Sequence, residues 1–172
     1  MSEQTFEVGG AGLPRGARLG VDVGKARVGL AASDPDGLVA TPVETVPRVL
    51  DAQGADSADV RRIAAEAEER FAAVVYVGLP RHLSGAEGAA TADARAFAAR
   101  LALAVTPVPV RMVDERMSTV TATSQLRAAG RKSRSHRPVI DQAAAVIILQ
   151  SALDAERAAG ARAGELVEAP QT

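Results

Sequence analysis

A short run of apolar residues, Val74 to Val77, constrains the fold of this chain more than any other feature. The run is continuous and ends at Gly78-Leu79-Pro80, so it predicts a strand that is buried on both faces. A strand with one face in water would alternate apolar and polar residues instead. Strands buried on both faces occur mainly in parallel sheets covered by helices on each side. The run therefore predicts an α/β protein with this strand near the middle of the sheet.

Helical patterns precede and follow this strand. Between residues 57 and 71, apolar side chains recur every three or four positions, with charged residues on the other side. Ser84 and Glu87 form a capping box, which predicts the start of an alanine-rich helix. Later elements are expected at 108–113 (strand), 118–130 (helix) and 138–158 (helix). Strands that alternate with helices predict parallel pairing and right-handed crossovers.

The first third of the chain predicts an antiparallel meander. Residues 18–23, 28–33 and 39–46 are rich in apolar and β-branched residues, and a strong turn signal at 34–37 separates the last two. With the two later strands, the meander gives a mixed five-stranded sheet that carries helices on both faces. We expect a single domain over residues 18–158, with disordered tails at 1–17 and 159–172.

Composition excludes several functional classes. The chain of 172 residues has no Cys, which excludes disulfides, thiolate metal sites and a Cys nucleophile. No apolar run approaches the roughly 20 residues of a membrane span, and residues 1–17 lack the apolar centre of a signal peptide. We therefore expect a cytoplasmic protein with no membrane partner. Because the net charge is −1, nucleic acid would have to bind a local basic patch.

One carboxylate, that of Asp22, lies inside the first predicted strand. Its neighbours from Leu19 to Gly24 are apolar or small, and an isolated carboxylate is costly to bury in its ionised form. Asp22 therefore needs an Arg or Lys, a set of hydrogen bonds, or a bound cation. Alternatively, Asp-Val-Gly ends the strand and Asp22 closes a turn.

Two neighbouring acids, Asp114 and Glu115, end the strand predicted at 108–113. Taken alone, they are better explained as members of a strand-end ion pair with Arg111 or Arg116. Their significance depends on whether other acids reach the same place.

A further acid, Asp141, lies in the first turn of the last predicted helix. It precedes Ala145 by four residues and Ile148 by seven, so it shares the apolar face of that helix. A favourable interaction with the helix dipole explains its position along the helix but not this inward direction. Carboxylates that converge on one point require a cation, and oxygen ligands without Cys favour Mg²⁺ or Mn²⁺. Two such ions can support phosphodiester hydrolysis.

A basic run lies directly before the helix that carries Asp141. Residues 127–137 contain no acid and five basic residues: Arg127, Arg131, Lys132, Arg134 and Arg137. Many such runs are simply solvated loops. Here the run would overhang the predicted metal site, where its side chains could bind the phosphates of a structured nucleic acid.

Four blocks of the sequence, in order over residues 18–157, resemble the YqgF family. This family is also called RuvX-like, and its members are described as Holliday junction resolvases and pre-16S rRNA nucleases. The blocks are Asp22-x-Gly24 with Arg27-Val-Gly29-Leu-Ala-x-Ser33-Asp34; Val77-Gly-Leu-Pro80 with Gly85 and Gly88; Asp114-Glu-Arg-Met-Ser-Thr119; and Asp141-x-x-Ala144-Ala145 with Ile148-Leu149-Gln150. The resemblance implies a ribonuclease H-like fold and a metal-dependent nuclease that trims the 5′ end of the 16S rRNA precursor or resolves four-way DNA junctions.

Carried over to this chain, the resemblance implies a set of catalytic metal ligands. These are Asp22, Glu115 and Asp141, with Asp114 as the alternative to Glu115, and they would hold Mg²⁺ or Mn²⁺, as two ions. Thr121 departs from the family pattern, in which many relatives carry an acid, so a helper carboxylate on that helix loses support. The residues expected to contact nucleic acid are Lys25, Arg27, Arg116, Arg131, Lys132, Arg134 and Arg137.

Three functions are compatible with the sequence. The first is an endonuclease acting on structured RNA or branched DNA, with ribosomal precursor particles as a partner and a monomer or homodimer as the active form. The second is a nucleic-acid-binding factor that retains the fold but cleaves little. The third is a phosphotransferase, for which the chain is too short to form two lobes. Symmetrical junction cleavage would need a two-fold dimer, and no stretch predicts its interface.

Overall fold

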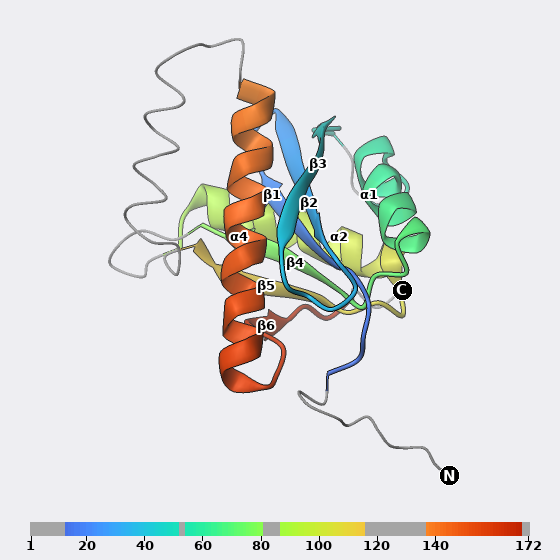
Figure 1. Cartoon of the computed structure of the whole chain (residues 1–172). Helices are drawn as coiled ribbons and strands as arrows, with labels where there is room; N and C mark the ends of the chain where they lie inside the picture. The colour runs from blue at the N-terminus through green and yellow to red at the C-terminus, as the bar shows by residue number, and fades with distance from the viewer. Residues whose placement is uncertain (1–12, 52–53, 81–86, 116–136, 170–172) are drawn as a thin grey trace.

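The computed structural model describes residues 13–51, 54–80, 87–115 and 137–169, with side chains from residue 142 onward in the last of these ranges. Within this part of the chain, six strands form one sheet in the order β3-β2-β1-β4-β5-β6 (Figure 1). The elements are β1 (Arg18–Val23), β2 (Arg27–Ser33), β3 (Ala40–Pro47), α1 (Ala58–Glu69), β4 (Val74–Leu79), α2 (Ala89–Val105), β5 (Val110–Asp114), α4 (Arg137–Ala159) and β6 (Glu165–Leu166).

The sheet is mixed, as the sequence predicts. β1, β2 and β3 form the antiparallel meander, while β1 pairs with β4 and β4 with β5 in parallel. All six residues of β4 are buried, which confirms the prediction from the apolar run at Val74–Val77. The α/β class and the mixed sheet covered by helices are therefore confirmed.

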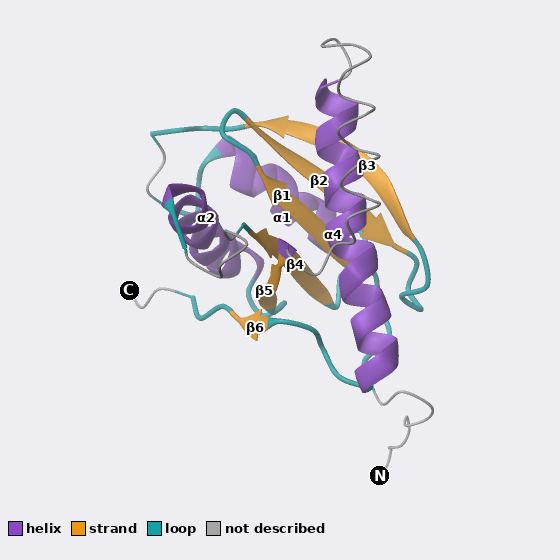
Figure 2. Ribbon diagram, turned by 90° about the vertical axis from the view of Figure 1, so that its left-hand side faces the viewer, coloured by secondary structure: helices purple, strands orange, loops and turns teal. Residues whose placement is uncertain are grey.

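Helices cover both faces of the sheet (Figure 2). Side chains alternate along β4, so Val75 and Val77 join the core beneath α1 and α2, whereas Val74 and Tyr76 join a second core beneath α4. Phe97 of α2 is fully buried in the first core. These two cores fix which face of the sheet each strand residue occupies. No helix in the described part of the chain combines the length and apolar character of a membrane span.

The structure corrects the prediction of a disordered tail after residue 158. α4 continues to Ala159, and β6 then pairs antiparallel with β5 as a sixth strand. The Val167 N–H donates to the Val110 carbonyl at 2.8 Å. Gly164 has a φ of +69°, and a Cβ there would lie 2.0 Å from the Met112 carbonyl oxygen. The segment is ordered by distant contacts, which its Ala- and Gly-rich local pattern does not reveal.

A buried polar network anchors this C-terminal segment at the end of the sheet where β1 begins. The Glu156 carboxylate is 3% exposed and accepts hydrogen bonds from Arg18 at 3.1 Å, from Arg162 at 3.0 Å and from the Tyr76 hydroxyl. The Ala163 N–H donates to the Tyr76 hydroxyl at 3.1 Å. Burial, together with the Glu156 carboxylate, raises the pKa of Tyr76. Arg18 and Glu156 are both buried, and each compensates the charge of the other, as burial of ionised groups requires.

The structure changes the predicted start of one helix. α2 begins at Ala89 with Gly88 as its N-cap, so it does not start directly after Ser84 as the capping-box pattern predicts. Ser84 itself lies outside the described residues, as does the helix predicted at 118–130.

Candidate active site

The carboxyl ends of three neighbouring parallel strands meet at one edge of the sheet. Val21 of β1 pairs with Val77 of β4, so Asp22 follows at the level of Gly78. Leu79 of β4 pairs with Asp114 of β5, and Glu115 follows that strand directly. Asp22 and the Asp114-Glu115 pair are nearly a hundred positions apart in sequence, yet the parallel topology brings them to the same edge.

Asp22 and Glu115 also lie on the same face of the sheet. A Cβ on Gly20 would lie 2.6 Å from Leu149 Cβ of α4, and side chains alternate along a strand, so Asp22 also faces the α4 side. A Cβ on Gly78 would lie 2.6 Å from Ile148 Cδ1 of α4, so Gly78 faces that side too. The Glu115 carboxylate lies over Gly78, one strand away from Asp22.

Gly78 provides the space that the Glu115 side chain occupies. A Cβ added to Gly78 would lie 3.0 Å from Glu115 Oε2 and 3.2 Å from Glu115 Cγ. Any other residue at this position would push the carboxylate away from its place between β4 and α4. The glycine is thus required by the close approach of Glu115 and Ile148.

The environment of Glu115 disfavours its ionised form. Burial raises the pKa of Glu115, and the nearby Asp114 carboxylate raises it further. Both effects disfavour an added negative charge, because the place is largely removed from water and already holds an acid. A bound divalent ion would reverse them.

The N-terminal end of α4 lies at the same level along the strands as Asp22. Gln142 Nε2 donates to Thr45 Oγ1 of β3 at 3.0 Å. Thr45 pairs with Gly29 of β2, and Gly29 pairs with Asp22 of β1. Asp141, next to Gln142 in α4, therefore has its backbone at the level of Asp22, while its side chain lies outside the described part of the structure.

Comparison with known proteins identifies the family. The family model described as "RuvX: Holliday junction resolvase" matches residues 16–155. The chain belongs to the RuvX family. This confirms the resemblance found in the sequence.

Close RuvX relatives cover nearly the whole chain. A protein of Clavibacter michiganensis subsp. michiganensis named "Putative pre-16S rRNA nuclease" is 64% identical over 152 residues, covering 88% of this chain and 91% of the relative. A protein of the same name from Nocardioides sp. is 58% identical over 155 residues, covering 89% of this chain and 97% of the relative. These names describe nucleases that act on RNA.

The ribonuclease H-like fold of this RuvX chain is shared with a solved structure. T. thermophilus RuvC in complex with a Holliday junction substrate superposes with a TM-score of 0.55, covering 85% of this chain and 98% of RuvC. The sequence identity is 18%, so the comparison shows the fold alone. The predicted fold class is confirmed.

The residues present at the RuvX site suit a hard divalent cation. Asp22 and Glu115 offer carboxylate oxygens, which Mg²⁺ and Mn²⁺ prefer, and Gly78 leaves room for one of them. Among the side chains that the structure describes, no three acidic or His groups gather closely enough to hold a metal. The third expected ligand, Asp141, falls outside those side chains. The structure thus brings two of the three predicted ligands to one edge.

Two of the predicted nucleic-acid contacts lie beside this edge. Lys25 and Arg27 belong to the tight turn between β1 and β2, which the Gly24 N–H closes by donating to the Arg27 carbonyl at 2.9 Å. Lys25 is exposed and Arg27 partly so. The other predicted contacts lie outside the described part of the chain: Arg116, Arg131, Lys132, Arg134 and the side chain of Arg137.

One residue that supports the site is not predicted from the sequence. Arg48 donates to the Gly24 carbonyl at 3.1 Å and forms a bidentate pair with Asp93 of α2 at 2.6 and 3.1 Å. Its guanidinium also lies 5.4 Å from the centre of the Phe97 ring. Arg48 therefore fixes the Lys25 turn to α2. No local pattern signals this role, because the partners of Arg48 are distant in sequence.

Proposed function

We propose that this protein is a metal-dependent endonuclease that hydrolyses phosphodiester bonds in structured nucleic acid, with the 5′ end of pre-16S rRNA as its substrate. The observation that carries the proposal is the placement of Asp22 and Glu115 on one face of the sheet, beside the Gly78 gap and the N-terminal end of α4. This function implies ribosomal precursor particles as the partner and the cytoplasm as the location.

The proposed metal ligands are Asp22, Glu115 and Asp141, with Asp114 as the alternative to Glu115. When bound, two Mg²⁺ or Mn²⁺ ions would supply activation of water and stabilisation of the leaving oxygen. The protein contributes an oxygen-only ligand set and a rigid base, since Asp22 lies near the end of β1 and Glu115 directly follows β5.

The residues around the ligands would bind and orient the substrate. Lys25 and Arg27 would contact phosphates from the β1–β2 turn, which Arg48 holds in place. Arg116, Arg131, Lys132, Arg134 and Arg137 would extend this phosphate-binding surface. Such contacts make binding weaken as the salt concentration rises.

A second candidate is resolution of Holliday junctions. The description of the RuvX family supports it, and so does the fold shared with RuvC. We favour rRNA because the relatives that carry the rRNA nuclease name are 55–64% identical to this chain, whereas RuvC shares the fold at 18% identity. A factor that binds nucleic acid without cleaving it is the remaining alternative.

The experiment that tests the proposal is a cleavage assay on both substrates. Purified protein is incubated with a 5′ fragment of pre-16S rRNA or with a four-way DNA junction, each with Mg²⁺, with Mn²⁺ and with a chelator. We expect metal-dependent cleavage of the rRNA and its loss in Asp22→Asn. The matched control is Asp36→Asn, because Asp36 is an exposed acid in the β2–β3 turn that pairs with Arg15.

The outcomes separate the candidates. Cleavage of the junction but not of the rRNA supports the second candidate. Binding without turnover under either metal supports the non-catalytic factor. An Asp22→Asn variant that cleaves as fast as Asp36→Asn would show that the acids at this edge are not the catalytic machinery.

A further inference from the structure

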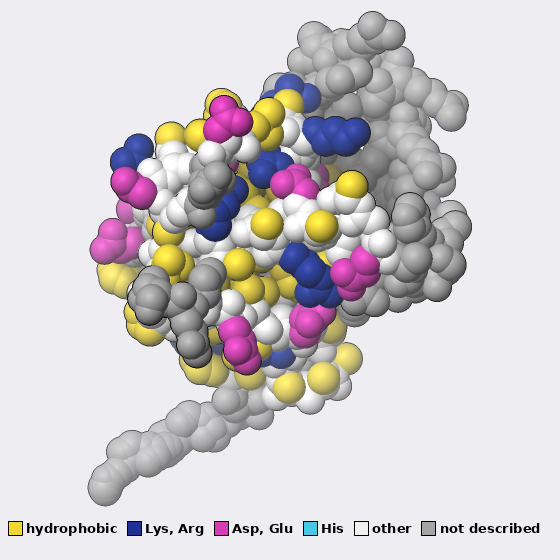
Figure 3. Space-filling view, turned by 180° about the vertical axis from the view of Figure 1, so that it is seen from behind, with side chains coloured by type: hydrophobic (Ala, Val, Ile, Leu, Met, Phe, Trp, Pro, Cys, Tyr) yellow, Lys and Arg dark blue, Asp and Glu magenta, His cyan; other side chains and the backbone are white. Residues whose placement is uncertain are grey.

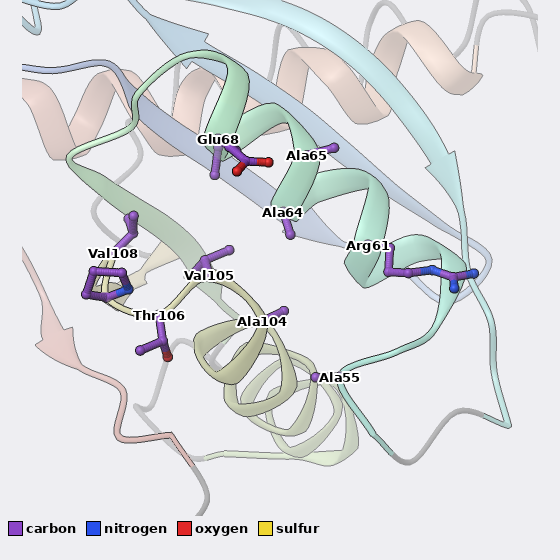
Figure 4. A pocket seen from close by; sticks show the side chains of 11 residues that line it. Ala55, Arg61, Ala64, Ala65, Glu68, Ala104, Val105, Thr106 and Val108 are labelled. Atoms are coloured by element: carbon purple, nitrogen blue, oxygen red, sulfur yellow. The ribbon is translucent and has the colours of Figure 1, made fainter.

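An open groove between α1 and the end of α2 lies away from the candidate active site. Its volume is about 610 Å³, and small or apolar residues line most of it (Figure 4). Figure 3 shows this side of the molecule, where hydrophobic side chains lie among charged ones. The groove borders Val108, which precedes β5, whereas Glu115 follows β5. A surface that serves the candidate active site must therefore be sought at the other edge of the sheet.

Two exposed apolar residues, Val49 and Leu50, lie at that other edge. They follow β3, and both β1 and β3 pair antiparallel with β2, so β1 and β3 end at the same edge of the sheet. Leu50 is 69% exposed and Val49 is 37% exposed. Only β2 separates the two strands, so about 10 Å lies between the end of β3 and the end of β1, which carries Asp22. The apolar pair is thus a neighbour of the proposed metal ligands.

Two buried charged side chains hold this exposed segment in place. The Arg48 side chain is 5% exposed and donates to the Gly24 carbonyl at 3.1 Å, while its backbone N–H donates to the Ala26 carbonyl at 3.0 Å. Asp59 is fully buried, and its carboxylate accepts a hydrogen bond from the Val49 N–H at 2.9 Å. Buried charges are costly unless hydrogen bonds compensate them, so these bonds fix the backbone of the segment.

The segment lies directly beside the cationic turn between β1 and β2. Lys25 is exposed in this turn, and Arg27 is partly exposed. Leu50 follows Arg48 by two residues, so at most about 7 Å of chain separates it from the hydrogen bond that joins Arg48 to the turn. The surface therefore places positive charge next to a rigidly held apolar side chain. Cations of this kind bind phosphates, and apolar side chains contact the faces of unstacked bases.

We propose that Val49 and Leu50 form a subsite for an unpaired base of the RNA substrate, next to a phosphate bound by Lys25 and Arg27. The proposal rests on the proposed function, because that function brings RNA to this edge. It adds a preference for RNA with unpaired nucleotides beside the cleaved bond. In a fully paired RNA the base faces are covered by stacking, so such an RNA would contact the cations of the turn but not the apolar pair.

Binding of two RNAs to the full chain tests the proposal. One RNA is a fully paired duplex, and the other is the same duplex with a short unpaired extension. Fluorescence anisotropy in the presence of a chelator measures each Kd without metal-dependent cleavage. We expect wild type to bind the extended RNA more tightly than the duplex. Leu50→Ala should weaken binding of the extended RNA by about three- to tenfold and leave binding of the duplex unchanged.

Two further variants show which kind of contact is lost. Leu166→Ala is the matched control, because Leu166 is 55% exposed in β6, and it should bind both RNAs as wild type does. Lys25→Ala should weaken binding of both RNAs and lower the slope of log K against log salt concentration by about 1. Leu50→Ala should leave that slope unchanged. It should also keep the melting temperature of wild type, because the side chain is largely exposed.

Three results would overturn the subsite. They are equal binding of the two RNAs by wild type, equal binding of the extended RNA by Leu50→Ala and Leu166→Ala, and equal weakening of both RNAs by Leu50→Ala. The chelator separates this test from the nuclease assay. Selective binding by a chain that cleaves nothing would reject the proposed enzyme and retain the subsite, whereas metal-dependent cleavage with no effect of Leu50→Ala would do the reverse.

Discussion

At the scale of single residues, the candidate site depends on a glycine that makes room for an acid. In any residue that replaced Gly78, the Cβ would lie 3.0 Å from Glu115 Oε2 and 2.6 Å from Ile148 Cδ1. The sequence marks Gly78 only as the end of an apolar strand. Its role depends on Glu115, which follows β5, and on Ile148 of α4, because both lie against it.

Replacing this glycine by alanine should weaken metal binding. Gly78→Ala would displace the Glu115 carboxylate, and displacing a ligand from its supporting contacts lowers metal affinity by about tenfold or more. Titration of Mn²⁺ by calorimetry measures the effect. The control is Gly54→Ala, because a Cβ there meets nothing within 4 Å. Equal affinities in the two variants would count against Glu115 as a ligand.

Glu115 itself should make stability depend on pH and on metal. Because burial and Asp114 raise the pKa of this carboxyl, the metal-free folded state binds its proton more tightly than the unfolded state does. This contribution to stability is complete below the unfolded pKa and is lost as the pH rises through the folded pKa. Without metal at neutral pH, Glu115→Gln should therefore melt at a higher temperature than wild type.

Added Mg²⁺ should reverse the order of these two melting temperatures. A free Mg²⁺ concentration of about ten times its Kd adds about 1.4 kcal/mol to the free energy of unfolding of wild type, and less to Glu115→Gln. Thermal melts of both proteins, with and without Mg²⁺, measure this. If wild type is already the more stable protein in a chelator, Glu115 is not an acid whose pKa is raised by burial and by Asp114.

At the scale of elements, the pattern of apolar residues predicts the central architecture but not the last strand. β1 to β5 follow from alternation, turn signals and the apolar run at Val74–Val77, since each signal is local. β6 is two residues long, and both residues are exposed. Its order depends on Gly164, whose backbone approaches Met112, and on the buried Glu156 network. Such contacts cannot be read from a window of neighbouring residues.

A matched pair of glycines tests how the C-terminal segment is held. Gly160 and Gly164 have φ values of +67° and +69°, so alanine at either position costs about 1 kcal/mol for the left-handed backbone. Only at Gly164 would the new Cβ also clash, at 2.0 Å from the Met112 carbonyl. Urea unfolding should therefore show Gly164→Ala to be less stable than Gly160→Ala by about 1–3 kcal/mol. Equal stabilities would mean that β6 adds little to the fold.

At the scale of the whole molecule, topology assembles the site from distant segments. The order of strands and helices predicts parallel pairing, and parallel pairing brings the ends of β1, β4 and β5 together. The identity of the acids follows from the sequence, whereas their common face follows from the packing of α4. The role of Arg48 comes from packing alone and leaves no local signal, because its partners Gly24 and Asp93 are distant in sequence.

We expect Asp22, Glu115 and Asp141 to bind the same metal centre. Titration of Mn²⁺ followed by electron paramagnetic resonance measures this directly in wild type, Asp22→Asn, Glu115→Gln and Asp141→Asn, with Asp114→Asn testing the alternative ligand and Asp36→Asn as control. We predict that wild type and Asp36→Asn bind Mn²⁺ alike and that each ligand variant binds it at least about tenfold more weakly. Unchanged Mn²⁺ affinity in the three ligand variants would contradict the account.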